Sequence, residues 1–82
     1  HLFQLLPEAV LDRLAEAQAD LPPQLKKAAT WVLENAASVS VSSVREIAEA
    51  AEVKPNTLVR MARAIGFDGF EDFREPFRAE VR

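Results

Sequence analysis

The chain has 82 residues and a formal net charge of −3, a length that suits one domain with one modest core. Hydrophobic residues make up 49% of it, which is typical of a globular chain and not of a disordered one. Cysteine is absent and the one histidine is His1, so disulfides and the usual zinc sites are excluded, and no metal or cofactor is expected.

Two further global features concern the cellular setting. The sequence contains no apolar stretch long enough to span a bilayer and no signal-peptide pattern at its start, so we expect a cytoplasmic protein without a membrane partner. It opens with His1 and stops at Arg82 within an expected helix, and we therefore expect a fragment. Residues 1–82 are expected to form a single domain.

The first two helices are predicted from proline positions and apolar spacing. A helix is expected from about residue 7 to 19, because Pro7 suits a first helical turn and apolar residues recur at helical spacing at Val10, Leu11, Leu14 and Ala17. Leu21-Pro22-Pro23 ends it, and a second helix is expected from Pro23 to about Asn35. Its apolar stripe consists of Leu25, Ala28, Ala29, Val32 and Leu33, with Trp31 packing beside it.

A connector and a short third helix follow. Residues 38–42 alternate like a strand, but the run is too short and has no partner, so we expect a connector or a single helical turn. Ser43-Val44-Arg45-Glu46 has the pattern of a capping box, with serine at the N-cap and glutamate three residues later. This pattern predicts a helix that ends near Ala51.

Two more helices complete the expected architecture. Pro55 suits the first position of a fourth helix over residues 55–65, after which Gly66 can adopt the left-handed conformation and Phe67 can fold back. A fifth helix is expected beyond Asp68, and Pro76 predicts either a kink in it or a late start. Its apolar side is expected to carry Phe70, Phe73, Phe77 and Val81. The predicted fold is an all-α bundle of five helices.

The segment from Ser43 to Gly66 is the most informative. Two short helices are separated by only Glu52-Val53-Lys54, a spacing typical of a helix-turn-helix. Val53 is apolar and is expected to pack into the core between the two helices. No acidic residue lies between Glu52 and Asp68, whereas three basic residues do: Lys54, Arg60 and Arg63.

Helical geometry predicts a polar face on the fourth helix. At about 100° per residue, Asn56, Arg60 and Arg63 gather opposite the apolar side, with Thr57 at the border. Arginine and asparagine can read guanine and adenine in the major groove, while Lys54 and the first backbone amides are placed for phosphates. The candidate DNA-contacting residues are therefore Ser43, Lys54, Asn56, Thr57, Arg60 and Arg63.

The pattern is also compatible with two other interpretations. Exposed arginine and asparagine are most often ordinary solvated surface. The chain could instead be a helical dimerisation module without direct DNA contact, using its acidic first helix and Trp31. An enzyme is not expected, since no nucleophile and base are paired in the pattern.

The sequence resembles the N-terminal domain of RpiR-type bacterial transcriptional regulators over roughly residues 5–80. The matching segments are Leu21-Pro22-Pro23-Gln24, residues 28–35, residues 44–51 and residues 56–73, with Thr57-Leu58-Val59-Arg60, Arg63, Ile65-Gly66-Phe67 and Gly69-Phe70 as the most specific parts. The resemblance implies an all-helical DNA-binding domain without a wing. It also implies a homodimer on a palindromic operator, and a sugar-isomerase-type domain beyond residue 82 that senses a phosphosugar effector.

Two residues depart from the family pattern. Glu52 stands where the turn usually has glycine, which costs about 1 kcal/mol if the backbone is left-handed there. Lys54 stands where a small hydroxyl residue usually caps the next helix, and it cannot cap. The resemblance further implies a role in regulating sugar or sugar-derivative metabolism.

Overall fold

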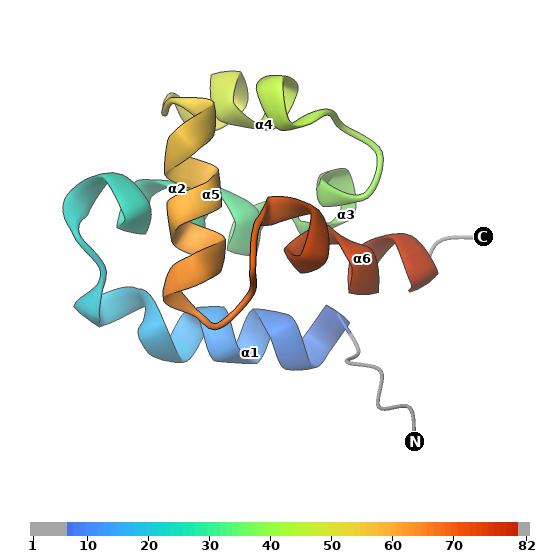
Figure 1. Ribbon diagram of the computed structural model, residues 1–82, viewed down its shortest axis with the longest axis horizontal. Coiled ribbons are helices and arrows are strands. Elements are labelled where there is room, and N and C mark those ends of the chain that lie inside the picture. The colour runs from blue at the N-terminus through green and yellow to red at the C-terminus, as the bar shows by residue number, and fades with distance from the viewer. Residues whose placement is uncertain (1–6, 81–82) are drawn as a thin grey trace.

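The computed structural model describes residues 7–80, and within that range it contains helices and no strand. Figure 1 shows them as a bundle in which α5 crosses the centre, from α4 at one end to α1 at the other. The helices are α1 (Pro7–Ala17), the 3₁₀ turn η1 (Gln18–Asp20), α2 (Pro23–Glu34), α3 (Ala36–Val39), α4 (Val44–Ala51), α5 (Pro55–Ala64) and α6 (Phe70–Glu80). The all-α prediction is confirmed.

The helix count of five is wrong, because α3 adds a single turn between the second and third expected helices. The chain leaves the helical conformation at Asn35, where φ is −132°, and the Asn35 side chain donates to the Trp31 carbonyl. Asn35 then opens the next turn, its own carbonyl accepting from the Ser38 N–H at 2.9 Å. The segment over residues 38–42, expected as a connector or a single helical turn, therefore begins within the helical turn α3 and ends as a loop.

The end of α1 also differs in detail from the prediction. The α-helix ends at Ala17, and Gln18–Asp20 tighten into a 3₁₀ turn. This tightening places the Gln18 side chain against α2, where its Nε2 donates to Thr30 Oγ1 at 2.6 Å. A polar bond therefore fixes the corner between the first two long helices.

The core lies around α5, which packs against α2, α4 and α6. Its fully buried large side chains come from every long helix: Val10, Leu14, Val32, Ile47, Leu58, Met61 and Phe73. Trp31 is half-buried and packs against this cluster, as predicted. Apolar residues spaced three and four apart thus meet at one centre.

Helix α6 begins at Phe70 and continues through Pro76, so the late start considered for it is wrong. Phe70, Phe73 and Phe77 are buried on its inner side, as predicted, while Val81 lies outside the described residues. Phe73 has three aromatic neighbours with ring centroids 5.4–5.7 Å away. Proline is accommodated because the packing of this aromatic side outweighs one missing backbone hydrogen bond.

The capping box at the start of α4 is present in full. Ser43 Oγ accepts from the Glu46 N–H at 3.0 Å, and Glu46 Oε1 accepts from the Ser43 N–H at 2.9 Å. Two amides that the helix itself cannot pair are thereby satisfied. Ser43 is exposed, so the bond acts through the helix end and not through core packing.

Ser43→Ala is expected to lower the free energy of unfolding by about 1 kcal/mol, because the Glu46 amide loses its acceptor. Urea denaturation followed by circular dichroism measures the change. Ser43→Asn is the matched control, since asparagine also caps well and should leave the midpoint nearly unchanged. An unaltered midpoint in Ser43→Ala would contradict the energetic role assigned to this cap.

Candidate nucleic-acid interface

Helices α4 and α5 form the predicted helix-turn-helix. After α4, the Val53 N–H donates to the Ala48 carbonyl at 2.9 Å and the Glu52 N–H donates to the Glu49 carbonyl at 3.1 Å. This pair of bonds is a Schellman motif, which ends a helix and reverses the chain sharply. Val53 is half-buried against the core, as predicted. The turn therefore holds α5 at a fixed angle to α4.

The same motif ends α5. The Gly66 N–H donates to the Arg63 carbonyl and the Phe67 N–H to the Ala62 carbonyl, with Gly66 at φ 103°. Phe67 folds back so that its ring meets Phe73 edge-on at 5.7 Å. Gly66 and Phe67 thus take the conformations that the sequence predicted.

Glu52 occupies the left-handed position of the first turn, with φ 62° and ψ 43°. It is the one residue other than glycine with positive φ within residues 7–80. A side chain in this conformation places Cβ close to the carbonyl oxygen, which costs roughly 1–2 kcal/mol. The left-handed conformation considered for this departure from the family pattern is confirmed.

Glu52→Gly is expected to raise the free energy of unfolding by about 0.5–1 kcal/mol, because glycine adopts the left-handed conformation without a steric penalty. Thermal denaturation measures the difference. Glu52→Ala is the matched control: it also removes the carboxylate but keeps Cβ, and its stability should stay near that of the unaltered chain. If both variants were stabilised equally, the gain would come from the loss of the carboxylate charge and not from relief of the backbone strain.

The outer face of α5 carries the predicted polar residues. Asn56, Arg60 and Arg63 are all exposed, opposite the buried Leu58, Met61 and Ala62. Within the described part of the chain, the side chains of Asn56 and Arg60 take part in no hydrogen bond or ion pair. Their donors and acceptors are directed to solvent.

Arg63 differs from Arg60 in one respect. Its Nε donates to the Asp68 carbonyl at 2.9 Å, across the turn that follows α5. This bond holds the stem of Arg63 over the end of the helix and satisfies a carbonyl there. Arg60 therefore has more freedom to adjust to a ligand than Arg63 does.

Thr57 does not lie at the border of the outer face. Only 7% of it is exposed, so its side chain belongs to the interior. The helical wheel allowed for one apolar stripe, whereas three helices pack against α5 and bury a wider arc. The hydroxyl of Thr57 is therefore withdrawn from the surface that Asn56 and Arg60 share.

The entrance of α5 is only partly suited to anions. Lys54 is exposed at the N-cap and makes no capping bond with its side chain, as predicted. Pro55 has no N–H, and the Thr57 N–H already donates to the Lys54 carbonyl at 2.9 Å. Of the first three helical residues, only Asn56 could offer its amide to an outside acceptor, so the Lys54 ammonium is the main cation here.

Ser43 lies at the start of α4, but its polar groups are engaged. Its N–H donates to the Glu46 carboxylate and its Oγ accepts from the Glu46 amide. A phosphate at this amide would have to displace a carboxylate. The capping geometry therefore favours a structural role for Ser43 over a phosphate contact.

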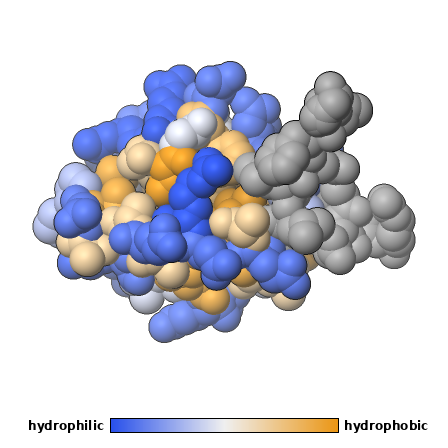
Figure 2. Space-filling view, turned by 90° about the horizontal axis from the view of Figure 1, so that it is seen from below, coloured by the Kyte–Doolittle hydropathy of each residue, from blue (hydrophilic) through white to orange (hydrophobic). Residues whose placement is uncertain are grey.

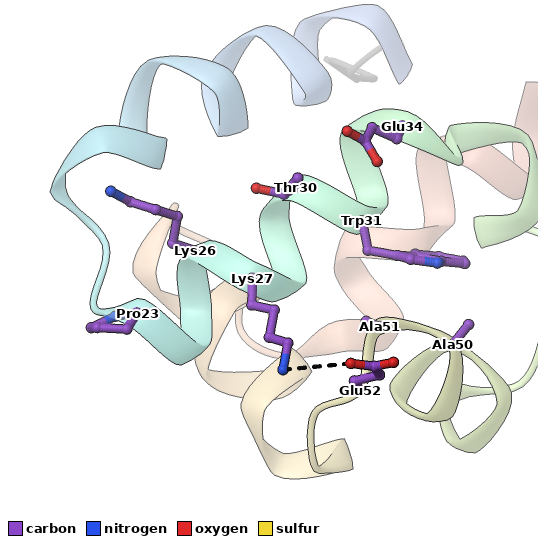
Figure 3. Close-up of a pocket in the computed structure, with 9 residues that line it drawn as sticks. All are labelled: Pro23, Lys26, Lys27, Thr30, Trp31, Glu34, Ala50, Ala51 and Glu52. Carbon is purple, nitrogen blue, oxygen red and sulfur yellow. Dashed lines mark ion pairs between the residues drawn. The ribbon is translucent and has the colours of Figure 1, made fainter.

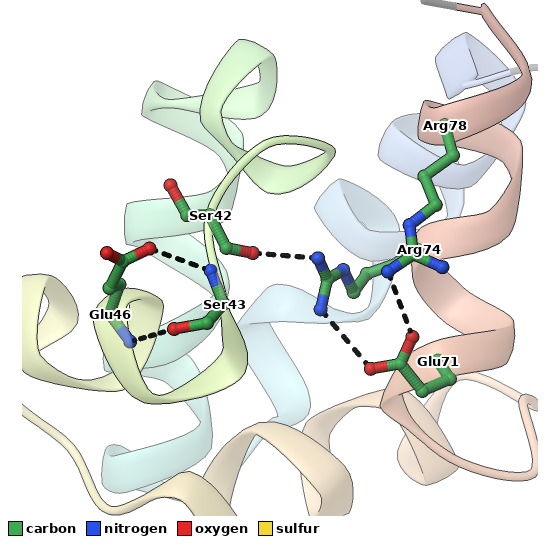
Figure 4. A network of polar contacts seen from close by, with 6 residues as sticks. All are labelled: Ser42, Ser43, Glu46, Glu71, Arg74 and Arg78. Atoms are coloured by element: carbon green, nitrogen blue, oxygen red, sulfur yellow. Dashed lines mark hydrogen bonds and ion pairs between the residues drawn. The ribbon is translucent and has the colours of Figure 1, made fainter.

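Sequence reasoning missed two arginines that fix these helices in place. Figure 4 shows Arg74 reaching from α6 to the loop before α4, where its Nη2 donates to the Ser42 carbonyl at 2.7 Å. Only 6% of Arg74 is exposed, and its Nη1 lies 3.2 Å from Glu71 Oε2. Glu71 Oε1 also lies 3.4 Å from Arg78 Nη2. This network joins α6 to the residue that precedes the Ser43 cap.

Arg13 likewise joins two helices, at the end of α5. Its Nη1 donates to the Ile65 carbonyl at 3.1 Å, and its guanidinium lies 5.5 Å from the centre of the Phe67 ring. Sequence alone gave no signal for it beyond an isolated base among the acids of α1. Arg13 therefore joins α1 to the end of α5, the second helix of the helix-turn-helix.

An exposed apolar strip on α1 would favour the alternative interpretation, a dimerisation module. Figure 2 shows the molecule from below relative to Figure 1, and hydrophilic residues interrupt the apolar areas on the part of this face that is not grey. Among the described side chains, the exposed large hydrophobic residue is Val41, at 73% exposure, in the loop before α4. A broad apolar surface for association is thus not found on the described part of α1.

Two other classes of site were sought among residues 7–80. No cluster of histidine, cysteine or carboxylate side chains in this range could hold a metal ion. None of its helices is both long enough and apolar enough to cross a membrane.

The arrangement of α4, its tight turn and an outward-facing α5 defines a helix-turn-helix domain. The chain belongs to the rpiR family of helix-turn-helix domains, whose family description matches residues 8–81. It is thus a DNA-binding domain of the helix-turn-helix class, as the sequence analysis expected.

Individual proteins are similar to it. The chain is 38% identical over 72 residues to an uncharacterized HTH-type transcriptional regulator of Haemophilus influenzae, with 88% of this chain and 25% of that protein covered. It is 32% identical over 65 residues to another from Caldanaerobacter subterraneus, with 79% of this chain and 23% of that protein covered. The chain thus spans about a quarter of the length of each.

A solved structure shares the fold. The N-terminal domain of the candidate transcriptional regulator ybbH from Bacillus subtilis superposes with a TM-score of 0.78 at 25% identity. The superposition covers 83% of each chain. Sequence and fold comparisons therefore agree on the type of domain.

Proposed function

We propose that this domain binds DNA sequence-specifically by inserting α5 into the major groove. The observation that carries the proposal is the outer face of α5, where Asn56 and Arg60 are exposed and make no side-chain bonds within residues 7–80. An α-helix fits the major groove, where arginine can donate two hydrogen bonds to guanine and asparagine can pair with adenine. Lys54, at the entrance of the helix, contacts phosphate.

The rigidity of the face supports the same proposal. Both ends of α5 are closed by turns with defined backbone bonds, and its inner side packs against three helices. A recognition helix that is held in this way loses little conformational entropy on binding. The base-reading side chains alone need to be ordered.

We further propose that the domain works as part of a longer regulator. The two relatives compared above are about three and a half times its length, which leaves room for a sensor domain beyond residue 82. By family resemblance that domain is of sugar-isomerase type and binds a phosphosugar, so that the protein regulates sugar or sugar-derivative metabolism. It acts in the cytoplasm as a homodimer on a palindromic operator, with one α5 in each half-site.

A selection of bound duplexes from a random DNA pool, followed by titrations at several salt concentrations, tests the proposal. Affinity for the selected duplex should exceed that for a scrambled duplex and fall linearly on logarithmic axes as salt rises. Equal affinity for both duplexes would contradict sequence-specific reading. Association of the chain without any DNA binding would favour the dimerisation module instead.

A further inference from the structure

A shallow groove separates α2 from the end of α4, and an ion pair crosses it (Figure 3). The groove is lined by Pro23, Lys26, Lys27, Thr30, Trp31, Glu34, Ala50, Ala51 and Glu52. Lys27 Nζ lies 3.9 Å from Glu52 Oε1, and the two side chains are 46% and 80% exposed. An ion pair with this exposure and length contributes little to stability, so it can open at low cost.

The position of Glu52 is unfavourable in two respects. Its backbone is strained in the left-handed region, and its carboxylate stands two residues before Lys54 at the entrance of α5. From Val53 to Phe67 the chain has no acidic residue. Glu52 and Asp68 flank this segment, and Glu52 is the acid on the side of the α5 entrance. A carboxylate beside the phosphate backbone lowers the affinity for DNA.

Lys27 stands close to the same entrance. Its helix α2 packs along α5, and Figure 3 shows its side chain pointing from α2 toward Glu52. Phosphates line both walls of a groove that a recognition helix enters, and flexible lysines commonly reach them from neighbouring helices. The Lys27 ammonium therefore has two possible partners, Glu52 in the unbound domain and a phosphate in the complex.

We infer that Lys27 is a phosphate-contacting residue that Glu52 holds in the unbound domain and releases to the DNA backbone on binding. This inference rests on the proposed entry of α5 into the major groove and extends the interface to α2. Glu52 thereby sets the affinity for DNA of any sequence. It has no part in choosing among sequences, because a phosphate carries no base information.

Four variants test whether Lys27 leaves Glu52 for a phosphate on binding. They are Lys27→Met, Glu52→Gln, the double variant, and Glu16→Gln as control. Glu52→Gln removes the charge but keeps Cβ and the backbone strain, so a change in its affinity is not a change in turn geometry. Glu16 is exposed on α1, at the far end of α5 from the turn. Fluorescence anisotropy with a labelled mixed-sequence duplex is measured at several salt concentrations, and thermal melts confirm that each variant folds.

Glu52→Gln is expected to raise the affinity for the mixed-sequence duplex about threefold to tenfold, and Glu16→Gln to change it much less. Lys27→Met should lower the affinity and reduce the salt slope by about one unit. The loss caused by Lys27→Met should be larger when Glu52 is already neutral, because Lys27 then meets the phosphate without competition.

Three results would overturn the inference. They are an unchanged salt slope in Lys27→Met, an unchanged affinity in Glu52→Gln, and an equal gain in Glu16→Gln. If the unaltered chain binds DNA with a steep salt dependence, and Lys27→Met, Glu52→Gln and Glu16→Gln all bind with that same affinity and salt slope, only the role of Lys27 and Glu52 fails. If the unaltered chain binds neither the mixed-sequence nor the selected duplex, the proposed function itself fails.

Discussion

Phe73→Ala is expected to lower the free energy of unfolding by about 3–5 kcal/mol. Phe73 is fully buried and contacts the rings of Phe67, Phe70 and Phe77. The truncation removes apolar burial. It also leaves a cavity that α6 cannot close, because Phe70 and Phe77 on either side of Phe73 keep the helix in place. Since small domains have total stabilities of about 5–15 kcal/mol, this loss is a large fraction of the total.

Denaturation by urea, followed by circular dichroism, measures the loss, and Phe73→Leu supplies a milder step if the alanine variant does not fold. Val41→Ala is the control, because Val41 is 73% exposed and its truncation should change stability by less than about 0.5 kcal/mol. A loss below about 1 kcal/mol for Phe73→Ala would show that α6 is not docked in solution.

Arg60→Ala is expected to weaken binding to the selected operator by about 1–3 kcal/mol while changing the affinity for a scrambled duplex far less. Arg60 is exposed at the middle of α5, and its guanidinium has no intramolecular bond within residues 7–80. Under the proposed binding mode, the contact that this variant loses is the one with a base edge. Specificity should flatten at one or two positions of the operator.

Lys54→Ala provides the contrast, because a phosphate contact has no sequence preference. It should weaken both duplexes about equally and reduce the salt slope by about one unit. Arg78→Ala removes one half-exposed positive charge from α6, where it pairs with Glu71, and should have a smaller effect on both. Equal weakening of the two duplexes by Arg60→Ala would identify Arg60 as a phosphate contact.

Much of the fold could be predicted because its signals are local. Pro7, Pro23 and Pro55 begin their helices where the fixed φ of proline is favourable, and Ser43 with Glu46 caps α4. Such signals depend on a few neighbouring residues, so they can be read without knowledge of the packing. The exposed face of α5 followed from the same helical periodicity.

The errors arose where several helices act together. Thr57 was placed at a surface border because a wheel contains one helix, whereas α2, α4 and α6 all pack on α5. Arg13 and Arg74 bond to carbonyls 52 and 32 residues away in the chain. No local pattern records a partner at that distance, and a buried arginine cannot be distinguished in sequence from a solvated one.

The Arg74 network also has a mechanical consequence. Arg74 donates a hydrogen bond to the carbonyl of Ser42, and the next residue, Ser43, caps α4. A movement of α6 must therefore either carry the start of α4 with it or break a charge-assisted hydrogen bond of 2.7 Å whose donor, Arg74, is buried. While that bond is intact, α6 and the start of α4 move together, so a displacement of α6 also displaces the helix-turn-helix.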